Sequence, residues 1–429
     1  MTRARRRSPM TLVALAVAVA FVAWSGGNAA ADEKADSEPT ESDFSNPPGR
    51  TIEDGWSNYD LGPLTFKWGL YTILDFGNAL QSDESAEQVE VEKGYKIRDF
   101  RFTFSGKLAL ERPVTYTMGL MYDGPTASWF PRETGIQVGI PELWGNVFIG
   151  RQKAGVSLNK VTVGYAVWTM ERMPIGDATI PIMNDGIKWL GGLPSKRANW
   201  NAAFFHNQLP KSPATDWYDN AFAARFAVLP MRPDEGDDQG SLLHLGLGYY
   251  WGDYADGETD LTARPESSTA PDFLDSGIFP ADQNHMFVPE AYYRKGSWLV
   301  GGEYILNFIR APEVGDPLVH GGEAFVAWIV TGEVRPYVDL GGKLGFVQPK
   351  SSAFSGGTGA LEAVLHYSYA DFDDGDVAGG RFWRVTPQLN WYVDNMVSLR
   401  ANYGLGRLDR FGTQEFTHFL QFRVQFQIE

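Results

Sequence analysis

The chain has 429 residues, a formal net charge of −16 and no cysteine, and 14% of its residues are aromatic. The lack of cysteine excludes a fold stabilised by disulfides, and the six histidines are scattered without the spacing of metal ligands. We therefore expect no metal site, no cofactor and no nucleic-acid partner.

Residues 1–31 have the pattern of a secretory signal peptide. Four arginines between residues 3 and 7 precede an apolar run at 10–24, and a series of small residues ends at Ala31. Cleavage there changes the formal net charge from −16 to −20, because the four arginines are removed. An uncleaved anchor helix is the alternative, although the apolar run is short for a span. No later stretch is apolar over about 18 residues, so we expect no other helical span.

Residues 32–56 are rich in Asp, Glu, Ser and Pro and have almost no apolar residues. A chain of this composition cannot bury enough apolar surface to fold. We predict a disordered, acidic periplasmic spacer between the signal peptide and a barrel that begins at residue 57.

From residue 57 to residue 429 the chain has the pattern of an all-β, antiparallel transmembrane β-barrel. In its last stretch, 416–428, Leu420, Phe422 and Val424 alternate with polar residues such as Arg423. Similar segments of about ten residues recur between turn residues, which is the signature of an outer-membrane barrel. We predict 16 strands, at 64–74, 95–108, 114–122, 134–140, 145–151, 185–193, 199–207, 220–230, 242–253, 284–294, 298–309, 321–332, 358–372, 380–393, 396–408 and 416–428.

The predicted connections alternate in length. In this class of barrel, short turns face the periplasm and long loops face outwards. The short turns are expected at 111–113, 141–144, 194–198, 295–297 and 394–395, and the long loops at 75–94, 152–184, 208–219 and 254–283. The segment 333–357 is long where a short turn is expected, so it is either one more hairpin or a segment folded into the lumen.

Several stretches resemble the phosphate-selective porin O and P family. Residues 147–174 are similar to its fifth strand and third loop, where the pattern G-Q-x-K…S-L-E…F-M-E-R is usual. The corresponding positions here are Gly150, Arg151, Gln152, Lys153, Ser157, Leu158, Met170, Glu171 and Arg172, while Asn159 departs from the family's Glu. Residues 292–304 resemble the family's hairpin ending in G-E-Y, residues 331–333 its T-G-E, and residues 366–403 its closing strands.

The resemblance implies a trimer of 16-stranded barrels in the outer membrane that passes anions. In known members, the third and fifth loops and one long periplasmic turn fold into the pore. Lysines and a ladder of arginines line the route. The segment 333–357 takes the place of that inward turn, which removes the difficulty in the strand count.

Side-chain alternation assigns the charges that face the water column, and these charges set ion preference. In the strand 95–108, Phe100 and Phe102 face lipid, so Arg101 faces the lumen. The same argument gives inward basic positions at Lys67, Lys107, Lys188, Arg225, Arg384, Arg400 and Arg423, with Arg151 at a strand end. The inward acids are expected at Asp99, Glu303, Glu323 and Glu362, which predicts a net basic wall.

The inward segments add lysines to this set. We expect Arg101, Arg384, Arg400 and Arg423 as wall contacts for anions, Lys153, Lys343 and Lys350 at the constriction, and Lys160 nearby. For any single basic residue, pairing with an acid across the wall is the alternative, so the prediction depends on the set. The fifth loop, 254–283, departs from the family, because it carries seven acidic residues and one arginine. Whether it enters the lumen is left open.

We expect a passive channel in the outer membrane of a Gram-negative cell, surrounded by lipid, that prefers phosphate or a related small anion. A general, weakly selective porin for small hydrophilic solutes is the main alternative. An outer-membrane enzyme is another, although no nucleophile, base and acid stand on adjacent predicted strands. A soluble exported β-sandwich is the last. We also expect Phe426 to act as the aromatic insertion signal of the last strand.

Overall fold

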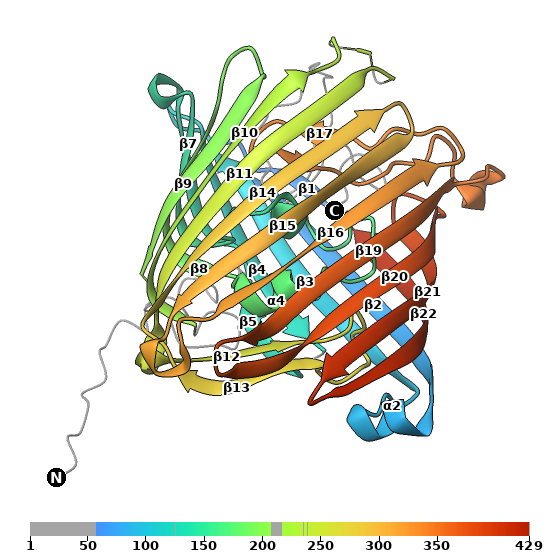
Figure 1. Cartoon of the computed structure of the whole chain (residues 1–429). Coiled ribbons are helices and arrows are strands. Elements are labelled where there is room, and N and C mark those ends of the chain that lie inside the picture. The colour runs from blue at the N-terminus through green and yellow to red at the C-terminus, as the bar shows by residue number, and fades with distance from the viewer. Residues whose placement is uncertain (1–56, 125, 207–216, 235, 238, 429) are drawn as a thin grey trace. The chain divides into compact units, whose positions relative to one another are not determined.

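The computed structural model describes residues 57–124, 126–206, 217–234, 236–237 and 239–428. The predicted signal peptide, 1–31, and the predicted spacer, 32–56, lie outside the described residues. Tilted antiparallel strands form a barrel (Figure 1). The 16 wall strands are β2 (Thr65–Gln81), β3 (Gly94–Leu108), β4 (Val114–Asp123), β6 (Thr134–Ile140), β7 (Gly145–Gln152), β8 (Asn184–Gly192), β9 (Ala198–His206), β10 (Tyr218–Met231), β11 (Ser241–Tyr254), β14 (Gln283–Lys295), β15 (Trp298–Arg310), β16 (Leu318–Ile329), β19 (Ala360–Asp374), β20 (Val377–Tyr392), β21 (Val397–Arg410) and β22 (Thr413–Ile428).

The barrel is closed by its first and last wall strands. β2 pairs with β22 in an antiparallel register that sets Asp75 opposite Arg423 and Leu70 opposite Ile428. Every other wall strand pairs with its neighbour in sequence, and the short strands β1 (Asn58–Asp60) and β5 (Ser128–Pro131) extend β2 and β4. Closure leaves no unpaired strand edge, as a span through hydrocarbon requires.

The predicted strand count is confirmed, and four strands have at least one boundary that differs from the prediction by more than two residues: β2, β16, β20 and β22. β20 and β22 each begin three residues earlier than predicted. β2 continues to Gln81, whereas the prediction ended the strand at residue 74. Beyond that point Asp75 faces the lumen while Phe76 and Leu80 are exposed on the outer face. Asp75, Gly77, Asn78 and Gln81 give this half of the strand the composition of a loop, which is why the prediction ended the strand too early. β16 spans Leu318–Ile329, three residues earlier than predicted.

The outer face of the barrel is apolar. In β22 the side chain of Phe422 is 41% exposed, whereas that of Arg423 is 2% exposed and lies inside. Large apolar side chains are exposed in the same way on the other wall strands, among them Phe102, Leu120, Ile136, Ile149, Ile187, Phe226, Leu247, Val300, Leu365 and Leu389. A water-soluble fold would bury such a belt, and a bilayer covers it.

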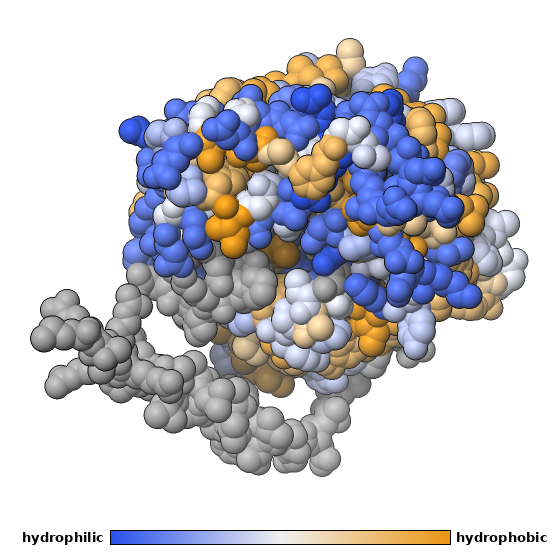
Figure 2. All heavy atoms as spheres, turned by 60° about the horizontal axis from the view of Figure 1, so that its bottom comes forward, coloured by the Kyte–Doolittle hydropathy of each residue, from blue (hydrophilic) through white to orange (hydrophobic). Residues whose placement is uncertain are grey.

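Helices contribute little to the described part of the chain. None of those that are described is long and apolar enough to cross a membrane. The loop end of the barrel, turned towards the viewer in Figure 2, is mostly hydrophilic, and hydrophobic residues appear along its upper and right-hand edges.

Three connections fold inwards. The third loop, 153–183, carries α3 (Leu158–Val161) and α4 (Pro174–Thr179), and the fifth loop, 255–282, carries the hairpin of β12 (Glu258–Ala263) and β13 (Leu274–Pro280). The long turn, 330–359, comes from the opposite end and carries β17 (Tyr337–Val338) and β18 (Lys343–Leu344). Figure 1 shows α4 inside the barrel, and it shows β12, β13 and α2 (Asp83–Gln88) at the lower end of the barrel.

The long turn meets the third loop in the lumen. Phe346 and Val347 of the turn are buried in one apolar cluster with Tyr165 and Ala166 of the loop. Leu344 joins a second cluster around Trp168. The segment 333–357 is therefore an inward-folded turn, as the family resemblance implied.

Replacing Phe422 by arginine tests the outer face. The Phe422→Arg variant should lower the free energy of unfolding by about 2–4 kcal/mol, because a guanidinium near the bilayer midplane loses its hydration. Urea unfolding in lipid vesicles measures the change. Phe422→Leu is the control and should lose less, and equal stability of the two variants would contradict a lipid-facing position.

Candidate functional site

Basic side chains gather where the third loop and the long turn approach the wall strands β3 to β8. The Lys188 ammonium donates to the Lys153 carbonyl oxygen at 3.0 Å. The charges of Arg132, Arg101 and Arg172 act on Lys153, and that of Lys343 acts on Lys188. We call this set the basic cluster, and its members are Arg101, Arg132, Lys153, Arg172, Lys188 and Lys343. Two carboxylates lie within it, Asp99 on Arg101 and Glu133 on Arg132, so the cluster has a positive excess.

The pKa shifts of Lys153 and Glu133 agree with a positive excess in the basic cluster. Burial lowers the pKa of the Lys153 ammonium. Glu133 opposes this shift, whereas the guanidinium groups of Arg172 and Arg132 add to it. Burial alone would raise the pKa of Glu133, but Arg132 and Lys153 bring it down to about 2. The carboxylate is therefore ionised at neutral pH, and a positive potential remains.

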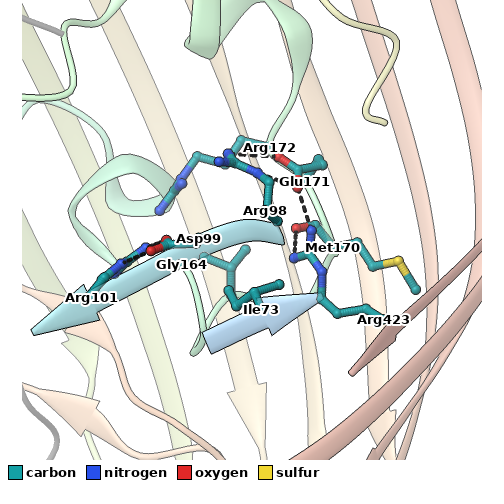
Figure 3. A pocket seen from close by; sticks show the side chains of 10 residues that line it. Ile73, Arg98, Asp99, Arg101, Gly164, Met170, Glu171, Arg172 and Arg423 are labelled. Atoms are coloured by element: carbon teal, nitrogen blue, oxygen red, sulfur yellow. Dashed lines mark hydrogen bonds and ion pairs between the residues drawn. The ribbon is translucent and has the colours of Figure 1, made fainter. Parts of the chain in front are cut away.

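A small pocket opens between β2, β3 and the third loop, next to the cluster (Figure 3). Glu171 of the loop lies between Arg98 and Arg423 and forms ion pairs with both, at 2.9 Å and 2.5 Å. Burial would raise the pKa of Glu171, and these two arginines lower it to about 2. Arg172 donates through Nε and Nη2 to carbonyl oxygens of the same loop, which orients its guanidinium.

Arg98 was missed from the sequence because of a β-bulge. The register of β2 and β3 shifts between the pairs Ile73 with Asp99 and Leu74 with Ile97, so β3 has one extra residue there. Arg98 and Asp99 consequently both reach inward, although strict alternation assigns Arg98 to the lipid face. Its ion pairs with Asp123 and Glu171 fix the loop side of the pocket.

The structure brings together four of the predicted inward and constriction residues: Arg101, Lys153, Lys188 and Lys343 belong to the basic cluster. Lys107 and Lys350 are exposed and lie outside the set. The Lys350 ammonium donates to the Gly332 carbonyl oxygen at 2.9 Å within the long turn. Of the three lysines that were predicted at a constriction, Lys153 and Lys343 lie in the basic cluster and Lys350 does not. Arg132 and Arg172 were not among the predicted pore residues.

Three other predicted residues are paired with acids. Arg151 makes two bonds to Asp185, at 2.8 Å and 2.7 Å, and the Lys160 ammonium lies 2.8 Å from Asp177. Arg225 donates to Glu290 at 2.7 Å. It also donates to two carbonyl oxygens of the long turn. These contacts agree with the pairing alternative.

The arginine row on β20, β21 and β22 exists, and its donors contact loop backbone. Arg400 donates to the carbonyl oxygens of Val167 at 2.9 Å and Tyr165 at 2.7 Å. Arg384 donates to the Pro265 carbonyl oxygen of the fifth loop at 2.6 Å. Arg423 binds Asp75 through two donors, each at 2.6 Å, and also contacts the third loop.

The wall holds more carboxylates than the sequence predicted. The further inward acids are Asp75, Asp123, Asp185 and Glu290, all buried. Asp75 was missed because it fell in a predicted loop. Together with the four expected acids they pair with much of the basic wall, so the positive excess of the wall is smaller than the sequence predicted.

The fifth loop enters the lumen with its apolar and small residues. Leu261, Ala270 and Phe273 are buried in the main apolar cluster of the lumen. Of its seven acids, Glu266 alone is deeply buried, where it lies 3.6 Å from His366 and 3.8 Å from Arg384. The other six are exposed or partly exposed. The acidic loop therefore adds little negative charge to the lumen. Among the residues described, no cluster of His, Asp or Glu is arranged to hold a metal ion.

Known proteins resemble this chain in sequence or in fold. Porin O of Pseudomonas aeruginosa is 25% identical over 203 residues, covering 40% of this chain and 45% of that protein. An uncharacterized protein of Caulobacter vibrioides is 26% identical over 167 residues, covering 38% and 34%. The matches thus span less than half of either relative. The anion-selective porin from Comamonas acidovorans has a TM-score of 0.53 at 11% identity, over 85% of this chain and 99% of that one.

The family assignment covers nearly the whole barrel. The family model described as phosphate-selective porin O and P matches residues 74–428. The chain has the closed barrel fold of outer-membrane porins, and porins are channels rather than enzymes. The chain belongs to the phosphate-selective porin O and P family and is an outer-membrane porin.

Proposed function

We propose that this porin is a passive diffusion channel that prefers small anions such as phosphate or a related oxyanion. The observation that carries the proposal is the basic cluster, where six cationic side chains from the wall, the third loop and the long turn surround two carboxylates. A low-dielectric wall focuses the field of such a group on the water beside it, so anions are concentrated there.

The chemistry of the cluster suits an oxyanion in transit. Arg101 and Arg172 each use two donors within the protein, and their remaining N–H groups can bind oxygens of a phosphate or carboxylate, while Lys153 and Lys188 act as compact point charges. Several weak sites in series allow passage, whereas one tight site would block it. The family description and the anion-selective neighbour of the same fold support this assignment.

A general, weakly selective porin is the second candidate. The observation that favours it is the charge pairing on the strand wall, where basic residues such as Arg151 and Arg225 are paired with acids. The two candidates differ in whether the basic cluster dominates the field at the narrowest point.

The oligomeric state that we propose is based on the family alone. We propose a homotrimer whose outer belt is partly covered by neighbouring barrels and otherwise by outer-membrane lipid. Crosslinking in native membranes that yields only monomers would contradict this part.

Charge reversal at Lys153 tests the anion preference. A unit charge about 10 Å from an ion contributes about 1 kcal/mol at an effective dielectric constant of about 30. Lys153→Glu should therefore lower the anion-to-cation permeability ratio by about tenfold, even with salt screening. Reversal potentials in a salt gradient measure it.

Matched lysines control that experiment. Lys343 lies in the cluster, so Lys343→Glu should also lower the anion-to-cation permeability ratio. Lys350 is exposed and lies outside the cluster, so Lys350→Glu should leave that ratio nearly unchanged. If Lys153→Glu and Lys350→Glu behave alike, the cluster does not control selectivity and the general-porin candidate is favoured.

The lowered pKa of Lys153 predicts a pH dependence. The charged form exists below the pKa, so the anion preference should fall as pH rises through a range below the ordinary lysine value of 10.5. Lys153→Arg keeps its charge throughout and should abolish this fall. Reversal potentials between pH 6 and pH 10 give the comparison, and identical profiles for the two proteins would refute the prediction.

A further inference from the structure

Three buried carboxylates form a row on the lumen wall. Glu290, Glu303 and Glu323 stand directly opposite one another on β14, β15 and β16, because the register pairs Glu290 with Glu303 and Glu303 with Glu323. Each is at most 6% exposed. Three adjacent carboxylates in a buried position need donors, and the strands themselves do not supply enough of them.

The third loop supplies those donors. The backbone N–H groups of Leu158 and Asn159 donate to Glu290 and Glu303, at 2.8 Å and 3.2 Å. The Ser157 hydroxyl donates to Glu303, and the Asn159 side-chain amide donates to Glu323 at 2.8 Å. All of these donors are N–H or O–H groups in the first half of the loop.

Residues 165–170, further along the same loop, present the opposite polarity to β20 and β21. Residues 165–170 contain no helix or strand, so their carbonyl oxygens have no partners in regular structure. The Arg400 guanidinium on β21 donates to the carbonyl oxygens of Tyr165, Val167 and Thr169 at 2.7 to 2.9 Å. Gln388 and Asn390 on β20 both donate to the Trp168 carbonyl oxygen at 2.8 Å.

We propose that Glu290, Glu303, Glu323 and Arg400 are positioning residues that fix the third loop against the lumen wall. Carboxylates on β14, β15 and β16 bind N–H groups of the loop. A guanidinium on β21 binds C=O groups of the loop. We call this arrangement the polarity clamp. It rests on the channel function of the barrel and sets where Lys153 and Arg172 stand, whichever ions pass.

The remaining charges near the row are internally compensated. Arg225 and His244 contact Glu290, and His366 contacts Glu323 at 3.1 Å. Glu303 receives neutral donors, including the Tyr292 hydroxyl at 3.1 Å. The row is thus satisfied by the wall and the loop together, and the loop supplies donors to all three carboxylates.

Asn159 is the residue that adapts this chain to the clamp. The resembling family pattern has Glu at this position, which would place a fourth carboxylate against the row. The amide of Asn159 instead supplies a donor to Glu323. The isosteric change Asn159→Asp should therefore release this side of the loop by removing the donor and adding a charge.

A single cysteine reports on the loop. Ala166 is fully buried at the meeting of the loop and the long turn, and the chain has no native cysteine. With Ala166→Cys in the full-length porin, reconstituted in liposomes, Asn159→Asp or Arg400→Gln should raise the rate of labelling by a charged, water-soluble maleimide at least tenfold. Both variants should also make single-channel current fluctuate between sublevels.

A reciprocal variant separates positioning from general damage. Glu323→Gln in the Asn159→Asp background exchanges donor and acceptor, and it should restore slow labelling and steady current. Arg112→Gln, which breaks an exposed ion pair with Glu142 in the turns, is the control and should leave labelling slow. Retention of the folded, heat-modifiable form on gels confirms the barrel in each variant.

The outcomes are distinct from those of the selectivity tests. Slow labelling in folded Asn159→Asp and folded Arg400→Gln would overturn the clamp, as would failure of Glu323→Gln to restore protection. If Arg400→Gln does not fold, Asn159→Asp and its reciprocal partner decide alone, since Asn159 lies outside the wall strands. If the wild-type channel shows no anion preference, the proposed function is refuted. Fast labelling of the Asn159→Asp and Arg400→Gln variants would still support the clamp in that case.

Discussion

The bilayer requires that every backbone N–H and C=O group within it finds a partner in the protein, because hydrocarbon offers none. The pairing of β2 with β22 meets this requirement for the whole wall, since it removes the last two free edges of the sheet. The alternation of side chains then follows: apolar groups such as Phe422 meet lipid, and polar groups such as Arg423 meet the lumen. Strand lengths, closure and the outer belt all depend on this constraint.

The same requirement applies inside the barrel, where two loops and a turn fill much of the lumen without forming a large sheet of their own. Their backbone groups are buried, so the wall must satisfy them. Arg400 and Arg384 bind carbonyl oxygens of the third and fifth loops, and Arg335 of the long turn binds the Ala166 carbonyl oxygen together with Glu362. Much of the lumen charge therefore holds the inward segments in place, and the basic cluster beside β3 to β8 keeps a net charge towards water.

The predictions that failed share a physical origin in tertiary structure. Alternation assigned Arg98 to lipid, but a bulge in β3 turns it inward. Asp75 was assigned to a loop because Asp75, Gly77, Asn78 and Gln81 give this half of β2 the composition of a loop, and the net basic wall was inferred without it. The ladder of Arg384, Arg400 and Arg423 was located correctly by alternation. Its contacts with loop carbonyls depend on how 153–183 and 255–282 fold, which no local pattern encodes.

The sequence by itself determined the 16-strand wall and the boundaries of most strands, because a strand in a bilayer must alternate along its length. It left two possibilities for the segment 333–357, and the resemblance to the porin family favoured the inward turn. The sequence also placed Arg101 on the inward face and predicted Lys153 and Lys343 together at a constriction. Only the tertiary structure decided which charges are compensated. Compensation depends on contacts between residues as distant as Asn159 and Glu323 or Arg423 and Asp75, and such contacts exist only when the barrel is closed and the loops lie inside it.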